Sequence, residues 1–351
     1  MLISHGANVN SQHSCNNTER QSPLFIAVEN AYPECVVLLL AHKADVNALT
    51  SEYRKTTLMA AARNTHSYAG IKFVDDRCHC IRLLLAEGVA VNTTCPGGQT
   101  ALMFATWNLQ LSRSLVEAGT DVNYLDNFRR SALWYAIHGA YAEVVELLLD
   151  RGANPNVAGT YDDTPLHQAC SCHTISPAVV GLLLRRGADI DTVNHNGKTA
   201  LQLVLSLAKQ DVSWYAIKGG YAAVVAVVEL LLDRGANPNV ADTYGDTPLH
   251  QACSSQILSP AVVDSLLRHG ADIDTVNDNG ETALQLVLSR AKCASLEAVI
   301  QLIYTYEQIR AQIQLVENYS ADWIRLAQNQ RNRPQMALGF MGTARQRRRN
   351  R

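Results

Sequence analysis

The chain has 351 residues, and its 30 lysine and arginine side chains nearly balance its 32 aspartate and glutamate side chains, leaving a net charge of −2. So small a charge excludes strong attraction of the whole molecule to nucleic acid or to a membrane surface. The nine cysteines are an odd number without the close, even spacings of a disulfide framework. Residues Met1–Gly6 lack the apolar core of a secretory leader. The most apolar run, residues 222–232, is interrupted by Glu229 and is too short to span a bilayer. We therefore expect a soluble, monomeric protein of the cytoplasm or nucleus.

The first residues have the pattern of the end of a helical unit and not of its beginning. Residues 1–14 contain the sequence His5-Gly6-Ala7-Asn8, which is typical of a helix stop, but no first helix precedes it. The interpretation is a partial N-terminal repeat that is either frayed or part of a fragment. An array that opens halfway through a unit is expected to expose an apolar edge.

From residue 15 to residue 292 one pattern recurs, and residues 164–187 show it most clearly. Thr164 can cap a helix with its hydroxyl, and Pro165 suits the first helical position. A second, leucine-rich helix follows, and Gly187 can take the left-handed conformation that ends it. The pattern predicts a helix, a tight turn, a second helix, a glycine stop and an extended loop to the next cap.

Eight copies of this pattern follow one another. Their capping residues are Ser22, Thr56, Thr100, Ser131, Thr164, Thr199, Thr247 and Thr282. The Thr-Pro-Leu-His-x-Ala signature, on a period of about 33 residues, resembles the ankyrin repeat. The resemblance implies an all-α solenoid of stacked helix pairs with β-hairpin loops, in a family whose members bind other proteins and generally do not catalyse reactions.

Two insertions interrupt the period. One falls near residues 64–76, where it is expected to lengthen the turn between two helices and to form a candidate functional loop. The other falls at 210–221, at the seam of a tandem duplication in which residues 134–209 recur as 214–292. There we expect a first helix at 199–209, a second at about 222–234 and a looped-out segment between them. The alternative is a ninth, truncated unit.

The glycine stop does not return after residue 292. Apolar residues at steps of three and four predict one or two amphipathic helices over residues 293–331. We interpret them as a C-terminal cap, and the alternative is a docking helix for a partner such as a ubiquitin-ligase component. Residues 332–351 are expected to be a disordered basic tail, whose arginines offer weak, unspecific contact with nucleic acid.

Side chains that could carry chemistry are better explained by packing. Neither the Cys78–Cys80 pair nor the Cys170–Cys172 pair has the ligand spacing of a zinc site. We expect no metal or cofactor, and we interpret Cys35, Cys80, Cys170 and Cys253 as small buried residues. His167 and His250 occupy a position where other copies have Phe25, Met59, Met103, Trp134, Gln202 and Gln285. So variable a position argues for a structural role, which the resemblance describes as bonding between adjacent loops, and the chain is not expected to be an enzyme.

The resemblance implies that a partner protein binds at the hairpin tips and the exposed side of the first helices. The residues that we predict to bind it are Tyr53, Trp107, Phe128, Arg130, Tyr161, Asp163, His195, Lys198, Tyr244 and Asp246. Aromatic and arginine side chains are those that most often carry contact energy at interfaces.

Two departures from the family pattern are expected to distort their hairpins. Lys43-Ala44 lacks the stopping glycine, and Phe128-Arg129-Arg130 lacks the glycine before the cap.

The expected function is that of a scaffold or adaptor, specifically a ubiquitin-ligase substrate receptor, and the alternative is a nuclear, transcription-associated regulator that uses the basic tail.

Overall fold

The computed structural model describes residues 6–12, 20–63, 71–172, 174–207, 220–254, 259–289, 297–312 and 314. The chain comprises two compact units, Met1–Lys292 and Cys293–Arg351. In the second unit, residues 297–312 form a helix. Apart from residue 314, the rest of the expected cap and the whole basic tail lie outside the described residues.

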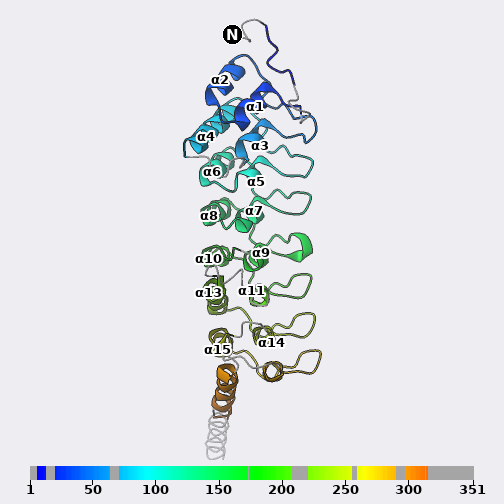
Figure 1. Cartoon of the computed structure of the whole chain (residues 1–351), viewed down its shortest axis with the longest axis vertical. Coiled ribbons are helices and arrows are strands. Elements are labelled where there is room, and N and C mark those ends of the chain that lie inside the picture. The colour runs from blue at the N-terminus through cyan, green and yellow to red at the C-terminus, as the bar shows by residue number, and fades with distance from the viewer. Residues whose placement is uncertain are drawn as a thin grey trace, which may run out of the picture. The chain divides into compact units, whose positions relative to one another are not determined.

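The first unit is a stack of helix pairs in two layers (Figure 1). One layer, next to the hairpin loops, contains the first helix of each pair: α1 (Pro23–Glu29), α3 (Thr57–Ala62), α5 (Ala101–Ala105), α7 (Ala132–His138), α9 (Pro165–Ser171), α11 (Ala200–Leu207), α14 (Pro248–Ser254) and α16 (Ala283–Leu288). The other layer contains the second helices: α2 (Pro33–Ala41), α4 (Ile71–Ala86), α6 (Leu109–Glu117), α8 (Ala142–Asp150), α10 (Pro177–Arg185), α13 (Gly220–Asp233) and α15 (Pro260–Arg268). Each helix packs on the helix of the same layer in the next pair, as expected of an all-α solenoid.

The first helices begin at the predicted caps. The side chains of Ser22, Thr56, Ser131, Thr164 and Thr282 each accept a hydrogen bond from the backbone N–H three residues on. Such a cap satisfies one of the helix's otherwise unpaired donors. Among the described residues the loops contain no strand, and their isolated bridges include Leu49 with Thr56 and Val276 with Thr282.

A row of leucines two residues after the caps forms the core of the stack. These leucines are almost fully buried: Leu24, Leu58, Leu102, Leu133, Leu166, Leu201 and Leu249. Burying a leucine side chain stabilises a fold by roughly 1.5–3 kcal/mol. Because each one packs between neighbouring pairs, adjacent units stabilise one another.

Lys43 does not distort its unit, contrary to expectation. It adopts the left-handed conformation itself, with a φ of 60°, while Gly152 at the same place in another unit has a φ of 85°. The closing bond is the same in both units, since Ala44 N donates to Leu39 O at 3.0 Å and Ala153 N donates to Leu148 O at 2.9 Å. The lysine therefore makes the usual stop at a cost in strain of about 1 kcal/mol.

The expectation that Cys35 is buried is wrong. Cys80, Cys170 and Cys253 are buried as expected, but Cys35 is exposed. Val144, at the corresponding place in α8, is 2% exposed because α6 and α10 pack on either side of α8. In the described residues α2 has an outer-layer neighbour, α4, on one side only, and Val37 and Leu38 are exposed with Cys35. Apolar side chains are thus exposed on the outer face of α2, while residues 1–5, the expected helical part of the partial repeat, lie outside the described residues.

The first insertion does not simply lengthen a turn. Residues 64–70 lie outside the described residues, but residues 71–76, which we expected in the turn, belong to α4. Phe73 stacks on the guanidinium of Arg77 at 4.6 Å, one helical turn away, which favours the helical form of this segment. At the second insertion, residues 208–219 lie outside the described residues, and α13 begins two residues before the expected position.

Arg77 is fully buried beneath two first helices. Its Nη1 donates to the carbonyls of Ala60 and Ala61, both at 2.8 Å, and its Nη2 donates to Glu29 O at 2.9 Å. Burial lowers the pKa of this guanidinium from its ordinary value, against the opposing effect of Glu29. The three bonds satisfy carbonyls at the C-terminal ends of α1 and α3, where a positive charge also favours the helix dipole.

Candidate functional site

The hairpins that begin at residues 126, 194, 242 and 277 are each closed by an aspartate or an asparagine five residues before the cap. In the hairpin 242–246, Asp242 Oδ1 accepts hydrogen bonds from the backbone N–H groups of Tyr244 and Asp246, at 2.9 and 3.1 Å. Its Oδ2 accepts from Gln251 Nε2 at 3.0 Å. The carboxylate therefore holds the loop in shape and joins it to α14.

A glycine two residues before the cap lets successive hairpins approach closely. Gly245 has a φ of 72°, and a Cβ placed there would lie 2.8 Å from the backbone nitrogen of Asp278 in the next hairpin. The close approach allows Asp278 N to donate to Tyr244 O at 3.1 Å, and Asn127 N donates to Gly97 O in the same way. Only glycine combines this conformation with this spacing at no steric cost.

A third link comes from the variable position on the first helix. His167 Nε2 donates to Lys198 O of the next hairpin at 3.0 Å, while its Nδ1 accepts from Thr164 N. Gln202 reaches Asp246 O in the same manner, at 2.9 Å. The predicted bonding between adjacent loops is therefore present. Burial lowers the pKa of His167 from its ordinary value.

All three features change at or next to the hairpin 159–164, although His195 N of the following hairpin still donates to Tyr161 O at 3.0 Å. Gly159 stands where Asp242 stands, Asp162 stands where Gly245 stands, and Trp134 replaces the linking histidine. The Cβ of Asp162 would collide with the next hairpin in a regular loop. The loop instead forms the 3-10 turn η2 (Thr160–Asp162), in which both Tyr161 and Asp162 are left-handed.

Arg129, in the preceding hairpin, replaces the glycine that lets other hairpins approach closely. It takes the glycine position with a φ of 59°, and its own hairpin stays regular because Asp126 Oδ1 accepts from Phe128 N and Arg130 N, both at 2.9 Å. The distortion expected at residues 128–130 is therefore displaced to the following hairpin. Where a backbone bond links other hairpins, Thr160 uses its hydroxyl to donate to Phe128 O at 2.7 Å.

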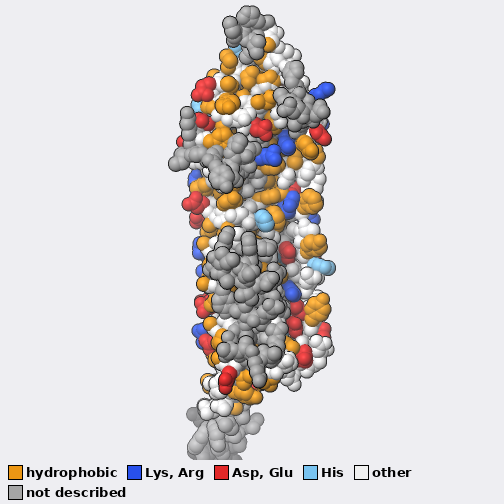
Figure 2. Space-filling view, in the orientation of Figure 1, with side chains coloured by type: hydrophobic (Ala, Val, Ile, Leu, Met, Phe, Trp, Pro, Cys, Tyr) orange, Lys and Arg blue, Asp and Glu red, His pale blue; other side chains and the backbone are white. Residues whose placement is uncertain are grey.

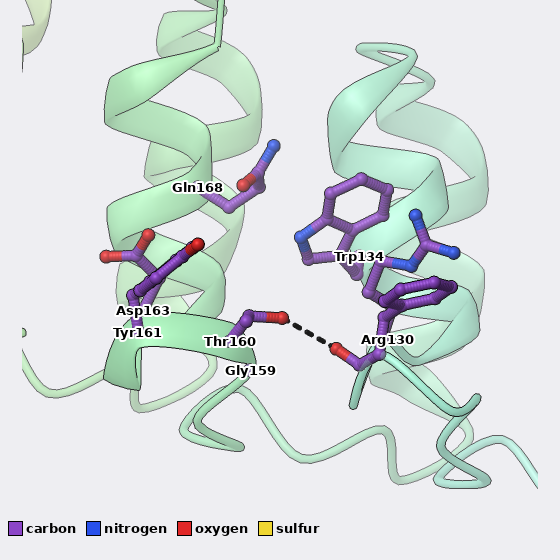
Figure 3. A pocket seen from close by; sticks show the side chains of 8 residues that line it. Arg130, Trp134, Gly159, Thr160, Tyr161, Asp163 and Gln168 are labelled. Carbon is purple, nitrogen blue, oxygen red and sulfur yellow. Dashed lines mark hydrogen bonds between the residues drawn. The ribbon is translucent and has the colours of Figure 1, made fainter.

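These changes leave a cavity of about 350 Å³ between the two hairpins, which we call the hairpin pocket. It is lined by Phe128, Arg130, Trp134, Gly159, Thr160, Tyr161, Asp163 and Gln168. Figure 3 shows Tyr161, Asp163 and Gln168 on one side and Trp134 and Arg130 on the other, with the indole nitrogen of Trp134 turned toward Gln168. A cavity with aromatic walls and a few polar groups is typical of a binding site.

One wall of the pocket is held rigid by a network around Arg130. Its guanidinium lies 4.7 Å from the Phe128 ring, 5.1 Å from Trp134 and 5.0 Å from Tyr135, and it forms an ion pair with Asp126. Tyr135 Oη also donates to Asp126 Oδ2, at 2.8 Å. Stacking and ion pairing together reduce the rotamer freedom of the arginine.

The network shifts the pKa values of its members. Burial alone would raise the pKa of the Asp126 carboxyl, but hydrogen bonds from Arg130, Tyr135 and the Phe128 N–H hold that pKa below its ordinary value. Burial and the bond to Asp126 raise the pKa of Tyr135 to about 12. Asp126 is therefore charged and Tyr135 is protonated at neutral pH, so the wall presents a paired cation.

The structure brings together four of the ten predicted binding residues and places the others elsewhere. Phe128, Arg130, Tyr161 and Asp163 line the hairpin pocket. His195 is next to it, with its ring 6.1 Å from that of Tyr161. The remaining hairpin residues lie on other loops, and they are Tyr53, Lys198, Tyr244 and Asp246. The Nζ of Lys198 is 4.0 Å from Asp242 Oδ2.

Trp107 is not on a hairpin. It lies in the turn between α5 and α6, where its indole N–H donates to Ala62 O at 2.8 Å. Hydrophobic side chains nevertheless recur along the hairpin side of the array (Figure 2). The exposed aromatic residues of the hairpins include Tyr53, Phe128, Tyr161 and Tyr244. The binding role of the ten residues stays a prediction.

Sequence reasoning missed four pocket residues: Trp134, Gly159, Thr160 and Gln168. The signal was available for two of them, because Trp134 is the bulkiest residue at the linking position and Gly159 is the only glycine at the aspartate position of the eight caps.

Within the described residues, no group of three His, Cys, Asp or Glu side chains is arranged to hold a metal ion, and no helix is long and apolar enough to cross a membrane.

Comparison with known proteins identifies the repeat. A family model described as ankyrin repeats (3 copies) matches residues 1–74, 74–159, 108–194 and 213–314. The crystal structure of the ankyrin repeat domain of Bcl-3, described as a unique member of the IkappaB protein family, is similar with a TM-score of 0.54 at 23% identity, covering 81% of this chain and 98% of that one.

Three curated relatives show how far the similarity extends. The B-cell lymphoma 3 protein homolog of Mus musculus is 29% identical over 201 residues, 50% of this chain and 44% of that protein. The neurogenic locus notch homolog protein 1 of Danio rerio is 33% identical over 165 residues, 47% and 6% of the two chains. The E3 ubiquitin-protein ligase KEG of Arabidopsis thaliana is 22% identical over 322 residues, 82% and 19%. The chain thus spans less than half the length of each of them.

Proposed function

The chain belongs to the ankyrin repeat family, and we propose that it is a protein-binding adaptor whose partner engages the hairpin pocket and the neighbouring hairpin tips. The observation that carries the proposal is the loss of both regular links between the hairpins 126–131 and 159–164, the backbone bond and the bond from the first helix, at the place where Phe128 and Tyr161 are exposed. A repeat array gains nothing in stability from such a gap, whereas an interface gains an anchoring cavity.

The physical character of the surface supports a protein partner. Phe128 is 60% exposed and Tyr161 is 69% exposed, so both have apolar area to lose on association. Arg130 is held by stacking and by Asp126, and a preorganised side chain reduces the entropy lost on binding. The proposal assigns binding to this chain and no catalytic step.

The experiment that tests the proposal compares two equivalent tyrosines. Tyr161 and Tyr244 occupy the same place in the two copies of the duplication and are 69% and 70% exposed. We expect Phe128→Ala and Tyr161→Ala to abolish capture of a partner from a cell lysate and to leave the melting curve unchanged, while Tyr244→Ala, at a regular hairpin, reduces capture less. Unchanged capture by the Phe128 and Tyr161 variants would refute this face.

The more specific role that we propose is that of a ubiquitin-ligase substrate receptor in the cytoplasm or nucleus, acting as a monomer. Its support is the similarity over 322 residues to an E3 ubiquitin-protein ligase. Mass spectrometry of the captured proteins tests this role, because ligase subunits should be enriched with the wild-type chain.

The alternative role is that of a nuclear, transcription-associated regulator. Its support is the similarity to the IkappaB-family protein Bcl-3 together with the arginines of residues 345–351. Chromatin proteins among the captured partners, together with loss of nuclear localisation and of salt-sensitive retention on nucleic acid when residues 345–351 are deleted, would favour this alternative.

A further inference from the structure

In this array an aspartate in the hairpin is accompanied by a hydrogen-bond donor on the following helix. Asp126 is paired with Tyr135 and Asp242 with Gln251, the donor being four residues after the cap in both units. Where the hairpin residue is an asparagine, as at residues 194 and 277, the helix position is a leucine, at residues 203 and 286. The donor therefore occurs where a carboxylate is present to accept from it.

The unit that contains the hairpin pocket keeps the donor but lacks the carboxylate. Gln168 stands at the place of Gln251, and Gly159 stands at the place of Asp242. Gln251 is 1% exposed and bonded to its aspartate, whereas Gln168 is only partly buried and its Nε2 lies 3.4 Å from His138 Nδ1. Gln251 is therefore bonded to a carboxylate, whereas Gln168, its equivalent, lines an open cavity.

Further donors converge on the same space. The indole N–H of Trp134 has no hydrogen-bond partner in the described part of the chain, and Figure 3 shows it turned toward Gln168. The guanidinium of Arg130 also lines the pocket; its pair with Asp126 occupies two of its nitrogens, and an arginine carries five N–H donors. The Asp163 carboxylate is held by Asn194 Nδ2 at 2.8 Å, as Asp246 is held by Asn277, so it belongs to the regular framework.

We infer that the hairpin pocket receives the carboxylate side chain of an aspartate or glutamate in an acidic segment of the partner protein. The incoming carboxylate takes the place that the Asp242 carboxylate has in the duplicated unit and accepts from Gln168, Trp134 and Arg130. Phe128 and Tyr161 contact the apolar residues that flank it. The inference rests on the proposed protein-binding function and specifies the chemistry that the partner presents.

The first test uses short peptides as the probe. Peptides are selected by phage display on the immobilised full chain, and each selected peptide is synthesised in two forms, one with its carboxylates and one with the matching amides. Fluorescence polarisation then measures both affinities. We expect the selected peptides to be acidic and the carboxylate form to bind at least about tenfold more tightly. Equal affinity of the two forms would overturn the inference.

The second test fills the pocket from within the chain. The double variant Gly159→Asp/Asp162→Gly gives residues 159–163 the sequence of residues 242–246. Its new carboxylate satisfies Gln168, so we expect acidic peptides to bind at least about tenfold more weakly. Gly159→Ala is the matched control, because its Cβ lies no closer than 3.4 Å to its neighbours and brings no carboxylate. We expect it to bind acidic peptides as the wild type does.

The outcomes separate this inference from the function on which it rests. If the double variant binds the selected peptides as tightly as the wild type, while Phe128→Ala and Tyr161→Ala still weaken them, the surface binds proteins but not through a carboxylate. If none of these variants weakens the selected peptides, or if no peptide is selected, both the inference and the proposed function are overturned.

Discussion

The exchange of two residues in the hairpin 159–164 tests the explanation given for the pocket itself. The variant Gly159→Asp/Asp162→Gly converts Gly-Thr-Tyr-Asp-Asp into the Asp-Thr-Tyr-Gly-Asp of residues 242–246. If the irregular loop results from the missing carboxylate and the misplaced Cβ, the variant should adopt the regular hairpin. It should also be more stable than the natural chain.

The magnitude follows from the contacts of the regular hairpin. The Asp242 carboxylate accepts three hydrogen bonds, from Tyr244 N, Asp246 N and Gln251 Nε2, at 2.9, 3.1 and 3.0 Å. At about 0.5–1 kcal/mol each, the same bonds add roughly 1.5–3 kcal/mol. Relief of left-handed strain at residues 161 and 162 adds about 1 kcal/mol. The entropic effects of losing one glycine and gaining another cancel, so the expected gain is about 2.5–4 kcal/mol.

Urea unfolding followed by circular dichroism measures this gain as a higher midpoint at an unchanged slope. The reverse exchange, Asp242→Gly/Gly245→Asp, is the control and should destabilise the chain by a similar amount, since a Cβ at residue 245 would lie 2.8 Å from Asp278 N. Equal or lower stability of the Gly159→Asp/Asp162→Gly variant would refute the view that these two residues create the irregular loop.

Two further predictions concern the framework. Arg77→Met should lower the free energy of unfolding by about 3 kcal/mol, because the carbonyls of Glu29, Ala60 and Ala61 lose a buried partner, and urea unfolding at or above the wild-type midpoint would contradict this. His167→Gln should make stability less dependent on pH below about 6.5, the ordinary pKa of histidine. The folded state holds that pKa low, so the unfolded chain binds more protons and the wild type loses up to about 1.4 kcal/mol per pH unit as the pH falls. Gln202 makes the same links in its own unit, which indicates that glutamine fits the site. Identical pH profiles of the wild type and the variant would show that His167 does not contribute to the pH dependence.

Most of the architecture could be read from local patterns. The capping serines and threonines, the leucine two residues later and the glycine stops predict where each first helix begins and which face is buried, and the structure agrees at Ser22, Thr164 and Thr282. These features need only interactions within one unit or between neighbours. For that reason a linear pattern is sufficient to predict them.

Burial at the edge of the stack and the form of the first insertion were not predictable in the same way. Cys35 has the sequence context of Val144, but its exposure depends on whether a helix packs on each side of α2. Residues 71–76 were assigned to a turn by their position in the period, and stacking of Phe73 on Arg77 accompanies the longer α4. In both places the deciding contact lies outside the repeating pattern.

A stack of helix pairs with exposed hairpins is predictable from local patterns, because capping, periodic burial and helix stops act over a few residues. The position of the cavity on that surface follows from contacts between units, which local patterns do not contain. The hairpin pocket depends on Arg129, Trp134, Gly159 and Asp162 acting on one gap between two loops about thirty residues apart. Each of the four looks tolerable within its own unit, and their effect is visible only when the separation of neighbouring hairpins is known.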